Sequence, residues 1–248
     1  MATNNGKAYL GLICFVGLSI LLLGIPASGS RWSGWDRLEG AAVQLWARDF
    51  GSMSALCSAT AVRSPDGKVY LLTAGHCAVQ PVIWSATQDG ATFYEARVVA
   101  SGWKLRGGVG FIDKIRSGLV VGRQTISHED VDTTGGDWGL METRMVPKQV
   151  LTLSSAKVAT GDRVFLVSYP IGGDRFGSEG VVANPSYAAP GTPWHRYIAA
   201  DISALPGSSG GGVVNEAGEV VGILVAGVGE SRLHLLTPAS LVKWPERK

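Results

Sequence analysis

Charge is scarce in this chain of 248 residues: Asp, Glu, Lys and Arg make up 17% of it, and the formal net charge is +2. No run of Lys or Arg stands out, which argues against nucleic acid or an anionic surface as the main partner. Neither a fixed-period repeat nor a low-complexity linker divides the sequence. Its length permits one large domain or two small ones.

Cysteine is scarce too, with three residues in the chain. Cys14 lies inside an apolar segment, so Cys57 and Cys77 are the only pair in the remainder. In an oxidising compartment two such residues are expected to be bridged. No metal is expected, because these thiols and the four histidines have no paired zinc-ligand spacing. The histidines are His76, His128, His195 and His234.

Residues 8–25 form an apolar stretch without charge, preceded by Lys7 and followed by small residues. Its length lies between that of a long signal-peptide core and that of a minimal membrane span. Ala27 and Gly29 make an A-x-A-like cleavage site before Ser30. We therefore expect residues 1–30 to be a signal peptide or an N-terminal membrane anchor. Both send the rest of the chain out of the cytoplasm, to a secreted, periplasmic or membrane-tethered location.

The remainder is rich in glycine, and its short apolar runs alternate with turn signals about every ten residues. Such a pattern indicates a β-sandwich or barrel, and only residues 238–244 look helical. Ser64-Pro65-Asp66-Gly67 suits a type I turn between two strands, which would bring Cys57 and Cys77 close enough for a disulfide. That bridge would pin the neighbouring His76. We expect two barrels, over residues 31–146 and 147–248.

A glycine-rich turn, LPGSSGGGVV, follows at Leu205 to Val214. Glycines around Ser209 would expose its hydroxyl and let a substrate backbone approach, as a nucleophilic serine needs. The backbone N–H groups of Gly207 and Ser209 would hold the oxyanion of a tetrahedral intermediate. Ser208 is a weaker candidate because it lacks the flanking glycines.

A serine nucleophile needs a base, and a histidine beside a carboxylate can take and return its proton. The sequence offers His76 in TAGHC and Asp137 in GGDWGLMET, at the head of an apolar strand that would bury it. The other carboxylates nearby belong to a cluster that we interpret as a solvated polar loop. That cluster consists of Glu129, Asp130 and Asp132.

The motifs TAGHC, DWGL and GSSGG, in this order, resemble those of the chymotrypsin-like (trypsin-like) serine peptidases. The resemblance implies an all-β fold of two six-stranded antiparallel barrels with a short C-terminal helix. His76 and Asp137 would come from the first barrel and Ser209 from the second, with no cofactor. Later segments are similar to the bacterial HtrA group, here without room for a PDZ domain. The Cys57–Cys77 pair is similar to the histidine-loop disulfide of secreted members.

One departure concerns activation. Ser208 stands where digestive trypsin-like enzymes carry an aspartate that pairs with a newly cut N-terminus, and no IVGG-like start precedes the first strand. We therefore expect the fold to be competent without such a cut.

Specificity follows from the pocket that the family builds from the segment before the serine and from the strand containing ILVAG. Ser203 occupies the counted base of this pocket, so a preference for Arg or Lys is not expected. Its Ser and Ala walls predict small or medium apolar side chains. The pocket residues are Ile202, Ser203, Leu224, Val225, Ala226 and Gly227.

These residues predict a serine endopeptidase that acts on protein or peptide substrates through an acyl-enzyme. One alternative is a catalytically weak relative that binds peptides or proteins in the same cleft. An esterase with the same triad is a second, but the G-x-S-G-G context differs from the G-x-S-x-G turn between strand and helix.

Overall fold

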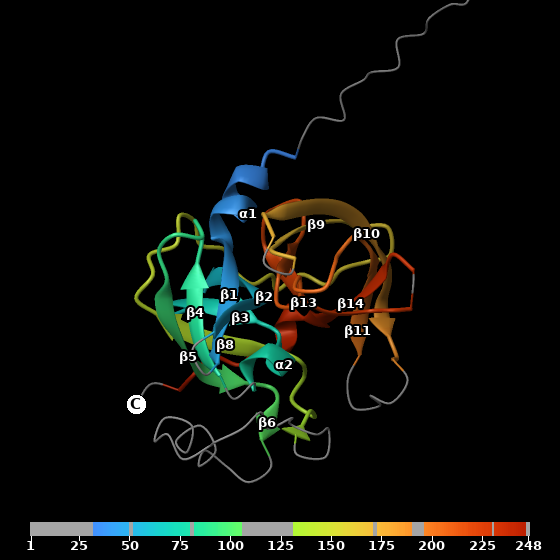
Figure 1. Cartoon of the computed structure of the whole chain (residues 1–248). Helices are drawn as coiled ribbons and strands as arrows, with labels where there is room; N and C mark the ends of the chain where they lie inside the picture. The colour runs from blue at the N-terminus through green and yellow to red at the C-terminus, as the bar shows by residue number, and fades with distance from the viewer. Residues whose placement is uncertain are drawn as a thin grey trace, which may run out of the picture. The chain divides into compact units, whose positions relative to one another are not determined.

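The computed structural model describes residues 32–49, 52–79, 82–105, 131–170, 173–189, 196–229 and 231–246. The apolar segment 8–25, His128 and His195 lie outside these ranges. Within them, no helix combines the length and apolar character needed to cross a bilayer. The described chain folds into two closed antiparallel β-barrels, which confirms the fold class predicted from the sequence (Figure 1).

The first barrel has the strand order β1-β2-β3-β8-β5-β4. Its hairpin from β2 to β3 contains the predicted turn, in which Gly67 has a φ of +88° and donates its N–H to Ser64 O. The strands are β1 (Ala42–Asp49), β2 (Ser52–Arg63), β3 (Val69–Thr73), β4 (Ile83–Thr87), β5 (Tyr94–Ser101) and β8 (Gly139–Thr143).

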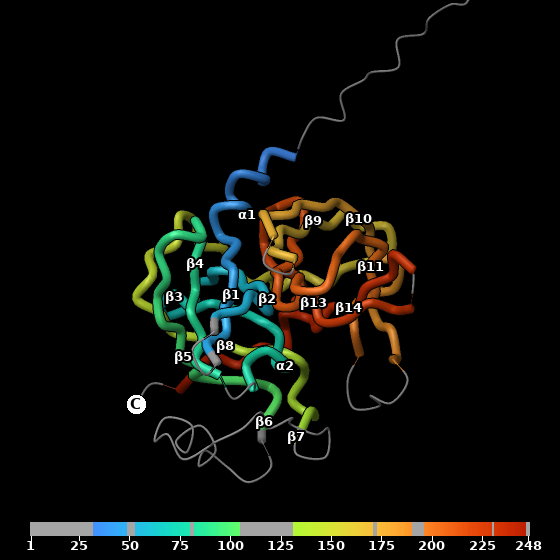
Figure 2. The backbone as a smooth tube through the Cα atoms, viewed as in Figure 1, coloured from blue at the N-terminus to red at the C-terminus, as the bar shows by residue number. Residues whose placement is uncertain are grey.

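The second barrel has the order β10-β11-β14-β13-β12-β9. The predicted boundary between residues 146 and 147 falls in the chain that runs from β8 to β9, where the backbone in Figure 2 passes from one barrel to the other. The strands are β9 (Arg163–Ser168), β10 (Phe176–Tyr187), β11 (Tyr197–Asp201), β12 (Gly212–Val214), β13 (Val220–Gly227) and β14 (Leu233–Pro238).

Helices are short and few in the described ranges. Residues 238–244, which look helical in the sequence, contain a single 3₁₀ turn, η2 (Ala239–Leu241). The sequence did not predict α1 (Trp35–Ala41), which precedes the first strand. Trp32 and Trp35 pack on Phe165 of the second barrel, with ring centroids 4.1 and 5.7 Å apart. The remaining elements are α2 (Gly75–Ala78), β6 (Lys104–Leu105) and β7 (Val131–Asp132).

The buried apolar residues form two clusters, one shared by the barrels and one inside the second barrel. One contains buried residues of both barrels, including Leu72 of β3 and Phe165 of β9. The other contains residues of all six strands of the second barrel and therefore fills its interior. Alternating side chains along each strand account for the division, because successive residues point to opposite faces. The shared cluster therefore joins the first barrel to the second.

Candidate active site

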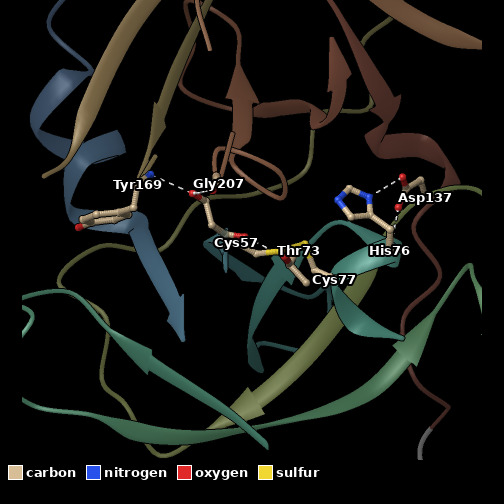
Figure 3. The surroundings of a disulfide bond; sticks show 8 residues. Cys57, Thr73, His76, Cys77, Asp137, Tyr169 and Gly207 are labelled. Carbon is tan, nitrogen blue, oxygen red and sulfur yellow. Dashed lines mark hydrogen bonds and ion pairs between the residues drawn. A yellow bond between two sulfur atoms is a disulfide. The ribbon is translucent and has the colours of Figure 1, made fainter. Parts of the chain in front are cut away.

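His76 lies on α2, a four-residue helix that begins two positions after β3 ends. A disulfide between Cys57 and Cys77 ties this helix to β2, with 6.5 Å between the two Cα atoms. Figure 3 shows the bridge beside the imidazole. The disulfide therefore holds the backbone that carries His76.

Asp137 contacts His76 at two points (Figure 3). Its Oδ2 is 2.9 Å from Nδ1 of the imidazole, and its Oδ1 accepts the backbone N–H of His76 at 2.8 Å. Asp137 is 5% exposed, whereas the imidazole side chain is 30% exposed. Because a carboxylate accepts and the ring must donate, Nδ1 carries the proton and Nε2 of a neutral ring is left as a proton acceptor.

Opposing effects act on the pKa of His76. Burial of the ring lowers the pKa, while the hydrogen bond to Asp137 and the negative charge of Asp137 raise it. The contributions of Asp137 together exceed that of burial, so the pKa lies above the ordinary value of 6.5. A base whose pKa is raised towards neutral pH is suited to general base catalysis.

Gly75 allows the two side chains to approach. A Cβ at this position would lie 2.9 Å from the backbone nitrogen of Trp138 and 3.0 Å from Oδ1 of Asp137. It would also lie 3.1 Å from the ring of Trp103, whose centroid is 6.0 Å from that of His76. A larger residue would therefore push the Asp137 loop or the tryptophan away from α2.

Asp132, the described carboxylate of the polar loop, forms hydrogen bonds within its own turn. Oδ1 of Asp132 accepts both the backbone N–H of Thr134, at 3.0 Å, and its hydroxyl, at 2.7 Å. Glu129 and Asp130 lie outside the described residues. Asp137 is thus the carboxylate that the structure brings to His76.

Ser209 lies on the loop between β11 and β12 of the second barrel. Gly207 and Gly210 on either side of it have φ angles of +91° and +90°, a conformation that residues with a Cβ rarely adopt. The N–H of Gly210 donates to the carbonyl of Leu224 on β13 at 2.8 Å. These glycines shape the turn that presents Ser209.

Ser58, on β2 of the first barrel, binds this loop. Its N–H donates to the carbonyl of Ser209 at 2.8 Å, and its hydroxyl donates to the carbonyl of Gly207 at 2.9 Å. The same hydroxyl accepts the N–H of Tyr169 at 2.9 Å. The carbonyl of Ser58 accepts the hydroxyl of Thr73, at the end of β3, at 2.7 Å. Hydrogen bonds therefore join the serine loop of one barrel to the strand that leads into α2 (Figure 3).

Ser208 differs from its neighbour in exposure and in partners. It is 0% exposed, and its hydroxyl oxygen accepts the hydroxyl of Ser168 at 2.9 Å and the N–H of Leu205 at 3.3 Å. Ser209 is partly exposed. A substrate can therefore reach the hydroxyl of Ser209 more readily than that of Ser208.

The six residues expected to form a substrate pocket are divided between core and surface. Ile202 and Leu224 are 0% and 3% exposed and pack inside the second barrel. Val225 is buried in the cluster shared by the barrels. The partly or fully exposed members are Ser203, Ala226 and Gly227.

Cys57, His76 and Cys77 place ligand-type atoms within 4.8 Å of one another. The two sulfurs form a disulfide, and metals are bound by thiolates, which a disulfide does not offer. This proximity is explained by the bridge.

Sequence reasoning missed the residues that support the site. Ser58 and Thr73 are ordinary members of predicted strands, and nothing local marks them as partners of a loop far along the chain. Trp103 follows a predicted strand, but its position beside His76 depends on the folded barrel.

Two antiparallel barrels, one with a hydrogen-bonded His–Asp pair and the other with a glycine-flanked serine, define a hydrolase of the trypsin-like class. The sequence matches the family described as Trypsin-like peptidase domain over residues 57–223. This span is more than half of the chain and includes His76, Asp137 and Ser209. The chain therefore belongs to the trypsin-like peptidase family, which confirms the resemblance drawn from the three motifs.

Curated relatives are similar over a shorter stretch. A probable periplasmic serine endoprotease DegP-like of Pseudomonas putida strain F1 is 35% identical over 69 residues, or 28% of this chain and 14% of the relative. The protein of the same name from Pseudomonas savastanoi pv. phaseolicola is 34% identical over 70 residues, or 28% of this chain and 15% of the relative. The chain therefore matches a small part of these relatives' length.

Solved structures support the fold over most of the chain. The HtrA-type protease AlgW, in a structure with a tripeptide, has a TM-score of 0.61 at 20% identity, covering 83% of this chain and 58% of that one. The active form of the protease Rv3671c from M. tuberculosis has a TM-score of 0.57 at 17% identity, covering 82% and 78%. At this level of identity, the likeness concerns the fold.

Proposed function

We propose that this protein is a serine endopeptidase in which Ser209 is the nucleophile, His76 the general base and Asp137 the residue that orients the base. The observation that carries the proposal is the double contact of Asp137 with His76. It keeps the proton on Nδ1 and leaves Nε2 of the neutral ring able to accept one. The anchoring of the Ser209 loop on Ser58 supports the same assignment.

In this mechanism the hydroxyl of Ser209 attacks the carbonyl carbon of the scissile peptide bond while Nε2 of His76 takes its proton. The negative charge of Asp137 stabilises the imidazolium that forms. His76 then donates the proton to the leaving amine as the C–N bond breaks. The acyl group remains bound to Ser209 as an acyl-enzyme. Water attacks the acyl-enzyme while His76 takes its proton. The ester bond to Ser209 then breaks, His76 returns the proton to the Ser209 oxygen, and the carboxylic acid product leaves.

The N–H groups of Gly207 and Ser209 form the oxyanion hole of this proposal. Neither donates a hydrogen bond to another described residue, so both are available to the oxygen that becomes negative in the tetrahedral intermediate. The left-handed conformation of Gly207 supports this role, because it turns the loop at that residue.

Export from the cytoplasm belongs to the same proposal. The disulfide suits an oxidising compartment, and the similar Pseudomonas proteins are named as periplasmic. We propose that residues 8–25 direct or tether the protein there. N-terminal sequencing of the mature protein distinguishes removal of this segment from its retention.

Labelling with a fluorophosphonate tests the central assignment. We expect the protein to be labelled and Ser209→Ala to be unlabelled, with Ser208→Ala as the matched neighbour that retains labelling. We also expect labelling without any N-terminal trimming. If peptides bind but the protein is neither labelled nor active, a catalytically weak peptide-binding relative is the better description. If the protein hydrolyses esters but not peptide amides, it is better described as an esterase.

A further inference from the structure

His234 lies on β14, beside the strand β13 that leads away from the serine loop. Leu224 of β13 exchanges hydrogen bonds with that loop, accepting the N–H of Gly210 at 2.8 Å and donating to the carbonyl of Gly211 at 3.0 Å. From Leu224 the strand continues to Gly227, which pairs with His234 on β14. At about 3.3 Å per residue, Gly227 is roughly 10 Å along β13 from the point where the loop is attached, and His234 lies beside it on the next strand.

The imidazole of His234 faces the inside of the second barrel at its open end. Leu236, two residues further along β14, belongs to the interior cluster, and so does Ala200, the cross-strand partner of His234 on β11. Residues at alternate positions and residues directly paired across strands share a face of the sheet. Both cross-strand neighbours of His234, Ala200 and Gly227, are small, so no large side chain covers the ring from the paired position on either neighbouring strand.

The backbone fixes which nitrogen of His234 is available. The carbonyl of Arg232 accepts the N–H of Ile202 at 3.1 Å and lies 2.9 Å from Nδ1 of His234. A carbonyl cannot donate, so Nδ1 carries a proton. Nε2 is on the opposite side of the ring and lies 3.4 Å from the position that a Cβ of Gly227 would occupy. The missing side chain of Gly227 therefore exposes Nε2.

The positions of His76 and Ser209 indicate which part of the substrate lies on the second barrel, near His234. His76, on the first barrel, must reach the leaving amine, so the chain after the scissile bond lies towards that barrel. The acyl group bound to Ser209 stays with the second barrel. The side chain of the residue before the scissile bond then belongs to the second barrel, where β13 is bonded to the serine loop at Leu224 and pairs with His234 at Gly227.

We propose that His234 selects substrates by binding the side chain of the residue before the cut, and that this side chain ends in a carboxamide or a carboxylate. The inference rests on the proposed peptidase function and names its substrate class. A carboxamide NH₂ donates to Nε2 of the neutral ring, and a carboxylate accepts from Nε2 of the charged ring. The exposed ion pair of Arg232 with Asp201, at 3.1 Å, leaves little net charge nearby. This assignment is an alternative to the apolar preference expected from Ser203 and Ala226, and substrate profiling decides between the two.

Peptide-library profiling of the whole protein tests the assignment. We expect kcat/KM for peptides with Gln, Glu, Asn or Asp before the cut to exceed that for Ala or Leu by about 10-fold or more. His234→Leu should reduce this ratio at least 10-fold. Gly227→Ala, which covers Nε2 without changing the ring, should reduce it in the same direction. Asp201→Asn, which removes the neighbouring charge and leaves the imidazole in place, is the matched control and should keep the ratio.

The outcomes separate this inference from the function on which it rests. A wild-type preference for apolar or basic residues overturns the inference, and so does a ratio that His234→Leu leaves unchanged. In either case, labelling of Ser209 still supports the proposed peptidase function. A wild-type protein that is neither labelled nor active overturns both. Retained labelling of His234→Leu shows that the variant is folded, so a lost preference is not a loss of structure.

Discussion

Asp137 uses both carboxylate oxygens on one residue, binding the imidazole Nδ1 of His76 with Oδ2 and its backbone N–H with Oδ1. The first contact fixes the tautomer and the second fixes the first turn of α2 relative to the Asp137 loop. A single side chain therefore sets both the orientation of the base and the position of the helix that carries it.

Asp137→Asn should lower kcat by about 10³- to 10⁴-fold. If the amide NH₂ replaces Oδ2, it donates to Nδ1, so the proton moves to Nε2 and the ring can no longer accept from Ser209. The measurement is kcat for a peptide amide, with Asp132→Asn as the control, because the carboxylate of Asp132 binds Thr134 in its own turn. Equal losses in the two variants would contradict the assignment of Asp137.

The pH dependence of kcat/KM should report His76. Only the neutral imidazole takes a proton, so activity is low below its pKa and rises as pH passes through it. Since Asp137 raises the pKa of His76 above 6.5, we expect the midpoint of the rise above 6.5. In Asp137→Asn the residual activity should have its midpoint at lower pH, because the negative charge is gone. A midpoint that stays in place would show that another group controls the profile.

The Cys57–Cys77 bridge should contribute about 3 kcal/mol to the free energy of unfolding, as expected for a bridge across 20 residues. The double variant Cys57→Ala/Cys77→Ala, or the wild type in a reducing agent, should lose that amount in denaturant unfolding. It should also lose activity, because α2 carries His76. Cys14→Ser is the control and should change neither quantity. A reduced protein with full stability and activity would show that the bridge is dispensable.

Local patterns in the sequence predicted much of this molecule. Alternating apolar residues and Gly/Pro turns were sufficient for strands such as β2 and β3, and the resemblance carried by three motifs supplied the pairing of the barrels. The contact of His76 with Asp137 follows from that resemblance, because neither residue type at its own position specifies the other. The helical look of residues 238–244 was a weaker signal, and the structure has a single 3₁₀ turn there.

What the sequence could not supply are contacts between segments far apart in the chain. Ser58 binds Gly207 across 149 positions and Tyr169 across 111, and each partner is a backbone group that every sequence offers. Likewise α1 was not expected, because its packing depends on Phe165 of the second barrel. The orientation of His234 became visible only when its partners, Arg232 O and Gly227, were in place.

Gly210 is the position at which the close approach of the two barrels is most sensitive to a single methyl group. A Cβ there would collide with the carbonyl of Ser58 and the hydroxyl of Thr73, which are hydrogen-bonded to each other in the first barrel. The same Ser58 holds the serine loop through its N–H and its hydroxyl. Gly210→Ala should therefore displace Ser209 and slow fluorophosphonate labelling by about 100-fold, as expected when a reacting group moves by about 1 Å.

The left-handed backbone of Gly210 by itself also disfavours alanine. A variant at Gly161 distinguishes this backbone effect from the collision. Its φ of +92° is nearly the same as the +90° of Gly210, yet a Cβ at Gly161 would meet no atom within 4 Å. Gly161→Ala should lower the free energy of unfolding by about 1–2 kcal/mol from backbone strain and leave labelling at the wild-type rate. If both variants label at that rate, the anchoring of the loop on Ser58 does not position Ser209. If only Gly210→Ala is slow, the contact between the barrels does.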